Sequence, residues 1–269
     1  MILIGDALSQ LKTLDDQSVN MCITSPPYYG LRDYGVEGQL GLEPTVNEYI
    51  DNLCNIFDEV GRVLKPDGTC WINIGDSYNA SQPTLKDTNK LYGYQKWWGQ
   101  KALSTVMDYE RPKQIMSSKS QIGVPERFVV EMLNRGWIKR NTIIWHKPFC
   151  IPTQAKDRFT VDFEYLFMFA KQDKYYFNQQ FENDRNMRSI WRINPAHTKG
   201  AHFATYPEEL ITTPIKAGCP EGGVVLDPFG GSGTTGAVAR KLDRDYILIE
   251  LNPEYKELID KRLQQNRLF

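Results

Sequence analysis

The sequence lacks a long apolar run and any regular spacing of cysteines. No hydrophobic stretch approaches the roughly 18 residues that a membrane span needs, which argues against a membrane protein. The five cysteines are scattered and odd in number, which favours reduced thiols over a disulfide framework or a metal site. The opening MILIGDALSQL has no basic region or cleavage signature, so we expect no signal peptide and a cytoplasmic location.

The chain also lacks an excess of either charge, since its net charge is −1. That balance argues weakly against a nucleic-acid partner, but the distribution is uneven. Residues 1–78 hold 4 Lys/Arg and 12 Asp/Glu, residues 79–158 hold 14 and 6, and residues 159–269 hold 14 and 15. The basic middle third is either a phosphate-binding face or a solvated insertion rich in lysine.

Short apolar runs alternate with amphipathic stretches along almost the whole chain. This alternation is typical of a parallel sheet covered by helices, so we predict a Rossmann-like, doubly wound α/β fold with a mostly parallel, seven-stranded sheet. Strands are expected at residues 1–5, 19–24, 68–74, 140–145, 163–171, 222–227 and 244–250. Helices are expected at residues 45–64, 124–136, 207–218, 234–242 and 252–266.

Two segments interrupt the alternation. Residues 77–120 and 178–201 are polar, basic and aromatic without a sustained period. Loops of this length in a compact domain are usually functional or disordered. We therefore expect a core domain formed by residues 1–76, 121–177 and 202–269, with the two segments as insertions.

A glycine-rich turn joins an expected strand to an expected helix in GGVVLDPFGGSGTTGAVARKL. Gly231, Gly233 and Gly236 fit the G-x-G-x-x-G pattern, which lets backbone N–H groups and a helix N-terminus approach a ligand. Glu250 ends the next strand, where a carboxylate can accept both hydroxyls of a ribose. The pair predicts a nucleoside-containing cofactor. NAD is one candidate; Asp227, before the turn, instead favours a cofactor with a cationic amino-acid head, such as S-adenosyl-methionine.

The stretch TSPPYYG follows the expected strand at 19–24. Two prolines cannot continue a sheet ladder, so they fix a rigid bend with outward-pointing carbonyls. Ser25 adds an acceptor and Tyr28 a flat face for stacking. Such a site suits an exocyclic amine of a nucleobase, whose lone pair must be localised before it can attack a methyl group. This chemistry requires neither a metal nor a strong general base.

TSPPYYG together with DPFGGSGTTG resembles the amino-methylating DNA methyltransferases. The order of the two motifs, catalytic first and cofactor loop last, resembles their beta group. The resemblance covers nearly the whole chain, because GDAL at the start, RNTIIWHKP in the middle and HFATYPEEL near the end also match. It implies the class I methyltransferase fold with a permuted motif order, and S-adenosyl-L-methionine as the cofactor.

The resemblance also implies a role for individual residues. Ser25 and the Pro26 carbonyl would hold the target amine, Pro27 would complete the rigid bend, and Tyr28 would stack on the flipped base. Asp6 would lie by the cofactor adenine. The full set of expected cofactor-binding residues is Asp6, Ala7, His202, Phe203, Asp227, Phe229, Gly231, Ser232, Gly233, Thr234, Glu250 and Asn252.

Ser25 also bears on which base is methylated. In the family that the sequence resembles, Ser before Pro-Pro usually marks enzymes acting on N4 of cytosine, whereas Asp or Asn usually marks enzymes acting on N6 of adenine. We therefore expect cytosine N4, with adenine N6 as the alternative. Methylation at carbon 5 of cytosine is not expected, because it needs a thiolate and the chain has no Pro-Cys dipeptide.

A paired base must leave the stack to be methylated, so contacts to DNA must offset the cost of flipping. The expected partner is double-stranded DNA, and the two inserted segments would hold it through phosphate contacts, stacking and guanine recognition. Trp97 could instead pack against the sheet. The expected DNA-binding residues are Lys96, Trp97, Lys101, Arg185, Arg188 and Arg192.

Other functions also fit parts of the sequence. A nicotinamide-dependent oxidoreductase would explain the glycine turn and Glu250, but it leaves TSPPYYG without a role. A catalytically silent DNA-binding subunit would not need both motifs intact, and RNA could replace DNA as the substrate. A cognate restriction endonuclease is a possible partner, and both a monomer and a homodimer are compatible with the sequence.

Overall fold

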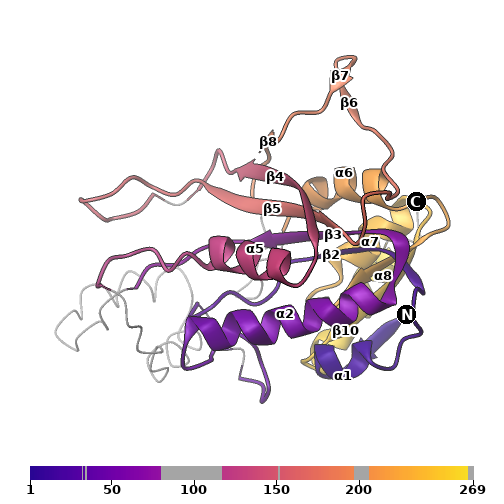
Figure 1. Ribbon diagram of the computed structural model, residues 1–269, viewed down its shortest axis with the longest axis horizontal. Helices are drawn as coiled ribbons and strands as arrows, with labels where there is room; N and C mark the ends of the chain where they lie inside the picture. Colours follow the sequence, from indigo (N-terminus) through magenta and orange to yellow (C-terminus); the bar gives the residue numbers. More distant parts are fainter. Residues whose placement is uncertain (32, 34, 80–116, 151, 197–205, 266–269) are drawn as a thin grey trace.

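The computed structural model describes residues 1–31, 33, 35–79, 117–150, 152–196 and 206–265 (Figure 1). Its main feature is an eight-stranded sheet in the order β1-β10-β9-β2-β3-β5-β4-β8. The strands are β1 (Ile2–Ile4), β2 (Val19–Thr24), β3 (Leu64–Ile74), β4 (Ile138–His146), β5 (Phe163–Ala170), β8 (Ile190–Arg192), β9 (Val224–Asp227) and β10 (Asp245–Glu250). A separate small hairpin pairs β6 (Phe181–Glu182) with β7 (Arg185–Asn186).

The sheet is mostly parallel. Strands β1, β10, β9, β2 and β3 pair in parallel, β5 runs antiparallel to both β3 and β4, and β8 pairs in parallel with β4. All seven predicted strands are present, which confirms the predicted fold class. The eighth, β8, lies inside the expected insertion at 178–201. Its three residues are too few to show a period, although Trp191 is 7% exposed and packs into the core.

Helices cover both faces of the sheet. Each predicted helix is present, and a short additional helix follows β1. The helices are α1 (Ala7–Leu11), α2 (Val46–Val63), α5 (Val124–Asn134), α6 (Glu208–Gly218), α7 (Thr234–Lys241) and α8 (Tyr255–Gln265). Figure 1 shows α1, α2 and α5 on one side of the sheet, with α6, α7 and α8 on the other. Buried side chains form a separate core cluster on each side.

Helix α2 anchors the first core cluster. Its start is fixed by a capping box, in which the Thr45 hydroxyl accepts from the Glu48 N–H and the Glu48 carboxylate accepts from the Thr45 N–H. Tyr49, Leu53 and Phe57 recur at helical spacing and are fully buried against the sheet.

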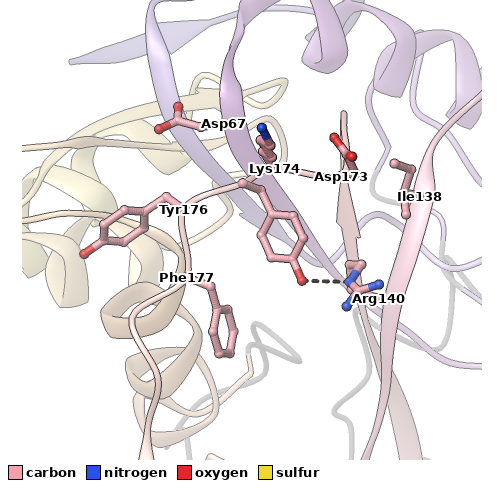
Figure 2. A pocket seen from close by; sticks show the side chains of 8 residues that line it. Asp67, Ile138, Arg140, Asp173, Lys174, Tyr176 and Phe177 are labelled. Carbon is pink, nitrogen blue, oxygen red and sulfur yellow. Dashed lines mark hydrogen bonds between the residues drawn. The ribbon is translucent and has the colours of Figure 1, made fainter.

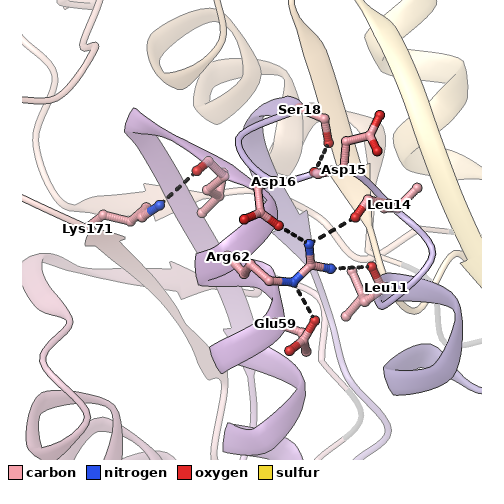
Figure 3. A network of polar contacts seen from close by, with 9 residues as sticks. Leu11, Leu14, Asp15, Asp16, Ser18, Glu59, Arg62 and Lys171 are labelled. Carbon is pink, nitrogen blue, oxygen red and sulfur yellow. Dashed lines mark hydrogen bonds and ion pairs between the residues drawn. The ribbon is translucent and has the colours of Figure 1, made fainter.

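The end of α2 is tied to the connection between α1 and β2 by Arg62 (Figure 3). Its guanidinium donates to the carbonyls of Leu11 and Leu14 at 2.8 and 3.0 Å, and it pairs with the carboxylates of Asp16 and Glu59. One planar donor group therefore satisfies four acceptors from three segments. This network has a structural role at the amino edge of the sheet.

A cleft also opens at that amino edge. Its volume is about 600 Å³, and Asp67, Ile138, Arg140 and Phe177 lie around it (Figure 2). The Arg140 guanidinium donates to the Tyr175 hydroxyl at 2.7 Å. Because Asp67 lies near the start of β3 and Ile138 begins β4, this cleft lies at the opposite edge from the carboxyl end of β3. Among the described helices, none has both the length and the apolar composition of a membrane span.

The carboxyl ends of five parallel strands meet at one edge of the sheet. TSPPYYG begins where β2 ends, and DPFGGSG begins at the end of β9. Glu250 ends β10, and a single residue, Gly5, separates Asp6 from the end of β1. In open α/β sheets, ligands bind outside this edge. The topology therefore gathers the predicted catalytic and cofactor motifs on the same side of the molecule.

Candidate active site

Asp227, at the end of β9, joins the end of β2 to the glycine-rich turn. Its carboxylate accepts from the Thr24 hydroxyl at 2.6 Å and from the Phe229 N–H at 3.0 Å on one oxygen. The other oxygen accepts from the hydroxyls of Tyr206, at 3.0 Å, and Thr235. Asp227 is 2% exposed, and burial raises its pKa although all four donors favour the charged form. TSPPYYG and DPFGGSG are therefore linked by a direct hydrogen bond.

The glycine-rich turn is closed by Glu250. One carboxylate oxygen accepts from the Gly231 N–H at 2.7 Å, and the other accepts from the Asn252 N–H at 2.9 Å. Gly231 has φ +50° and Gly233, which caps α7, has φ +81°, a region that side chains disfavour. Burial raises the pKa of Glu250, and the two N–H donors oppose that shift. Each oxygen can accept a second hydrogen bond, which ribose hydroxyls would supply.

Other predicted cofactor residues have structural partners at the same edge. The side chains of Ser232 and Thr234 accept hydrogen bonds from Arg262 on α8. The Asn252 side chain accepts from the Glu254 N–H at 3.0 Å. Asp6 caps α1 by accepting from the Ser9 N–H at 2.8 Å, so only its second oxygen is left for another ligand. Any contact from Ser232 to the cofactor would therefore come most readily from its backbone.

Ala7 is buried beneath this edge at 7% exposure, whereas Phe229 is half-buried on the glycine turn. Both follow strands that adjoin β10, and their role in cofactor binding stays a prediction. The predicted residues His202 and Phe203 fall outside the described residues.

The bend at Pro26 and Pro27 is held in place by Tyr49 of helix α2. The Tyr49 hydroxyl donates to the Pro27 carbonyl at 2.8 Å, and the ring of Tyr29 packs on Tyr49 with centroids 5.3 Å apart. Pro26 is buried, and Ser25 is half-buried at the end of β2. Because Tyr49 lies on the long helix α2, the bend is supported by the main core.

Tyr28 is fixed by a polar cluster from the neighbouring strands. Its hydroxyl donates to Glu164 at 2.7 Å, and the Asn73 amide donates to the same carboxylate oxygen at 3.1 Å. Lys147 pairs with the other oxygen of Glu164, and its ammonium lies 4.5 Å from the ring centre of Trp145. Burial, followed by the charge of Glu164, raises the pKa of Tyr28 well above its usual value. The hydroxyl therefore stays protonated and acts as a donor.

Contact with Gly75 also fixes the plane of the Tyr28 ring. A Cβ at Gly75 would lie 2.8 Å from the ring, so any larger residue would displace it. The Tyr28 ring is therefore held in one orientation by Gly75 below it and by the Glu164 carboxylate at its hydroxyl.

The sequence did not single out Asn73, Lys147, Glu164 or Tyr206. The first three lie in or beside segments that were expected as strands, at 68–74, 140–145 and 163–171, and no residue within those segments was chosen. A polar residue in an otherwise apolar strand run is a usable signal, and Glu164 in FEYLFMFA is such a case. Tyr206 offers no such signal, because its partner Asp227 is 21 residues away in sequence.

Three predicted DNA-binding arginines lie within the segment that forms the β6–β7 hairpin and strand β8. Arg185 is on β7, Arg192 is on β8, and Arg188 is between them, and all three are exposed. Figure 1 shows the β6–β7 hairpin projecting away from the sheet. Lys96, Trp97 and Lys101 fall outside the described residues.

The fold and the site together define an α/β methyltransferase whose catalytic motif precedes its cofactor motif. A family model described as DNA methylase, covering N6 and N4 methyltransferases, matches residues 19–261. The chain belongs to this family, which confirms the resemblance drawn from the sequence.

Two relatives are similar over nearly their whole length. The Type II methyltransferase M.SmaI of Serratia marcescens is 40% identical over 99% of this chain and 91% of its own. M.Cfr9I of Citrobacter freundii is 42% identical over 97% and 86%.

Solved structures share the fold. The PvuII DNA methyltransferase, described as cytosine-N4-specific, has a TM-score of 0.73 at 21% identity, over 97% of this chain and 85% of its own. TTHA0409 of Thermus thermophilus, complexed with S-adenosyl-L-methionine, has a TM-score of 0.68 at 25% identity, over 98% and 93%.

Proposed function

We propose that this DNA methylase transfers a methyl group from S-adenosyl-L-methionine to the exocyclic N4 of a cytosine flipped out of duplex DNA. The observation that carries the proposal is the hydrogen bond between Thr24 and Asp227, which joins the catalytic strand to the cofactor turn. Ser25 follows Thr24 directly, and the glycine-rich turn follows Asp227. This one hydrogen bond therefore holds the proposed amine-binding residue close to the proposed cofactor turn.

S-adenosyl-L-methionine supplies a methyl group made electrophilic by its sulfonium sulfur. The chain's task is to orient the amine and keep its lone pair free. The Ser25 hydroxyl and the Pro26 carbonyl would accept the two amine hydrogens, which favours a tetrahedral nitrogen. The bond from nitrogen to the methyl carbon would form as the carbon–sulfur bond breaks and a neutral thioether leaves. One of the two amine protons would then be lost to water past the Ser25 hydroxyl. Tyr28 supports the base by stacking while Glu164 and Asn73 hold its hydroxyl. Glu250 binds the ribose hydroxyls on the cofactor side. Positioning of this kind accounts for large rate enhancements without a general base.

Cytosine is favoured over adenine by Ser25. A neutral hydroxyl stands where the adenine enzymes of the family usually have Asp or Asn. The fold relative from PvuII, described as cytosine-N4-specific, supports the same choice. N6 of adenine is the alternative, because the same acceptors could hold either amine.

The remaining expectations follow from the family and the surface. Duplex DNA would be held by exposed arginines of the segment 178–201, with 77–120 as a second recognition segment and the other residues as the catalytic domain. The Type II relatives suggest a cognate restriction endonuclease as a partner. Action on DNA suggests a cytoplasmic location at the nucleoid, as a monomer or homodimer.

Analysis of the methylated nucleoside tests the proposal. The protein is incubated with labelled S-adenosyl-L-methionine and mixed duplex DNA or structured RNA, and the product is digested. We expect labelled N4-methylcytosine from DNA. Labelled N6-methyladenine would reassign the target base to adenine. Labelled product from RNA alone would reassign the substrate to RNA, and the absence of any methylated nucleoside would contradict the proposed function.

Replacing Tyr28 tests the assigned stacking role. Tyr28→Ala should lower kcat about 100-fold, because the base loses its support, while cofactor affinity is unchanged. Tyr175→Ala, at the cleft on the opposite edge of the sheet, is the matched control and should keep its activity. Full activity in Tyr28→Ala would remove this residue from the mechanism.

A further inference from the structure

We propose that Phe159, in the loop between β4 and β5, enters the DNA duplex and fills the space left by the flipped base. The inference rests on the proposed function and adds a second contact surface to it. The described part of this loop comprises residues 147–150 and 152–162, none of which was among the expected DNA-binding residues.

Phe159 is unusually exposed for an aromatic residue. Its side chain is 95% exposed, and Val161, two residues further on, is 43% exposed. Two exposed apolar side chains so close together in one loop form a small apolar surface, and apolar surfaces rimmed by polar residues are where partners bind. Figure 1 shows the connection between β4 and β5 projecting beyond the strands.

The loop is held in place by its neighbours. Asp157 pairs with Lys119 at 2.7 Å, and the Arg158 guanidinium lies 3.4 Å from the ring centre of Tyr78. Within the loop, the Thr153 N–H donates to the Thr160 hydroxyl at 3.2 Å. Phe159 is therefore presented on a braced support, which lowers the entropic cost of inserting it.

The loop is anchored at the catalytic edge of the sheet. His146, which ends β4, pairs with Phe163, which begins β5. The next residue, Glu164, accepts the hydrogen bond from Tyr28. Lys147, at the other end of the connection, pairs with the same carboxylate. The loop and the proposed base pocket therefore share one cluster of side chains.

The chemistry around Phe159 fits a nucleic-acid duplex. Lys156 and Arg158 lie close to it in the sequence, both exposed, and both can contact phosphates. The negative charge of Asp157 is balanced by Lys119. Apolar side chains that insert between base steps offset the loss of stacking in bent or opened duplexes. A flipped cytosine leaves such a gap.

The test separates help with flipping from help with chemistry. Two oligonucleotide duplexes are prepared around a site that the wild type methylates. In one the target base is paired, and in the other it faces an abasic position, so that flipping costs less. Methyl transfer from labelled cofactor is measured for wild type, Phe159→Ala, Phe159→Trp and Phe177→Ala. Phe177, which is 46% exposed at the opposite edge, is the matched control.

We expect Phe159→Ala to lose about 10- to 100-fold in kcat/KM on the paired duplex and to recover to within about threefold of wild type on the abasic duplex. Phe159→Trp should retain most activity, and Phe177→Ala should match wild type on both.

Three results would overturn the inference. The first is no loss on the paired duplex, and the second is an equal loss on both duplexes. The third is a change of oligomeric state in Phe159→Ala with methylation unchanged, which would assign the surface to a second copy of the chain. A wild type inactive on all DNA would instead reject the proposed function, and the inference with it.

Discussion

At the scale of single residues, the site depends on carboxylates buried for a structural purpose. Asp227 accepts four hydrogen bonds and Glu250 closes the glycine turn, and both are almost inaccessible. Leaving buried donors without partners costs about 1–3 kcal/mol for each group. Asp227 therefore holds the site together, whether or not it also meets the amino group of the methionine moiety.

The raised pKa of Asp227 predicts how stability changes with pH. The Asp227 carboxyl keeps its proton to a higher pH in the folded state than in the unfolded state, where its pKa is about 3.9. The unfolded state therefore binds fewer protons in this window, and the free energy of unfolding falls as the pH rises through the folded pKa.

Asp227→Asn removes this titration. We expect the difference in unfolding free energy, wild type minus Asp227→Asn, to decrease as the pH rises above about 4. Urea denaturation at several pH values measures this difference, and Asp173→Asn, at an exposed position, serves as the charge-matched control. An increasing difference for Asp227→Asn would contradict the assigned burial cost.

Glu164 offers a second test at this scale. Glu164→Gln weakens the acceptor for the Tyr28 hydroxyl and leaves Lys147 without its charged partner. We expect kcat on DNA to fall about 10-fold, with little change in cofactor affinity, since charge-assisted bonds are worth about 1.5–3 kcal/mol. Single-turnover methylation measures the effect. Glu257→Gln, in an exposed pair on α8, is the control, and equal rates for both variants would remove Glu164 from the base pocket.

At the scale of elements, the Glu250 carboxylate joins the end of β10 to the glycine turn that leads into α7, and we propose that these elements bind the cofactor together. Saturating S-adenosyl-L-methionine at about 100 times its Kd should stabilise the protein by about 2.7 kcal/mol. Thermal unfolding with and without cofactor measures this. Glu250→Ala should lose most of this stabilisation by the cofactor. The substitution removes both the proposed acceptors for the ribose hydroxyls and the hydrogen bond from the Gly231 N–H that closes the glycine turn. Glu254→Ala, an exposed neighbour, should keep it. An undiminished shift in Glu250→Ala would place the cofactor elsewhere.

The hairpin β6–β7 and strand β8 form the exposed arginine surface. Replacing Arg185 and Arg188 by Ala should weaken DNA binding and reduce the slope of log K against log salt by about 1.8, since each phosphate contact contributes about 0.9. Titration at several salt concentrations gives the slope. Lys256→Ala, on α8, controls for net charge. An unchanged slope would mean that these arginines do not contact phosphates.

At the scale of the whole molecule, the regular part of the fold was accessible from the sequence because each core strand has an apolar run with its own boundary. The proline bend and the glycine turn were also accessible, because each breaks the local pattern. Strand β8 and helix α1 were missed because three and five residues carry no period. The cluster of Tyr28, Asn73, Lys147 and Glu164 was missed because it forms only when β3, β4 and β5 pair.

The most direct test of the account is a crystal structure of the protein with S-adenosyl-L-methionine bound. We predict the ribose hydroxyls on Glu250 and the methyl group facing the bend at Pro26 and Tyr28, beside the Thr24–Asp227 hydrogen bond. Cofactor density in the cleft around Arg140, at the opposite edge of the sheet, would contradict it.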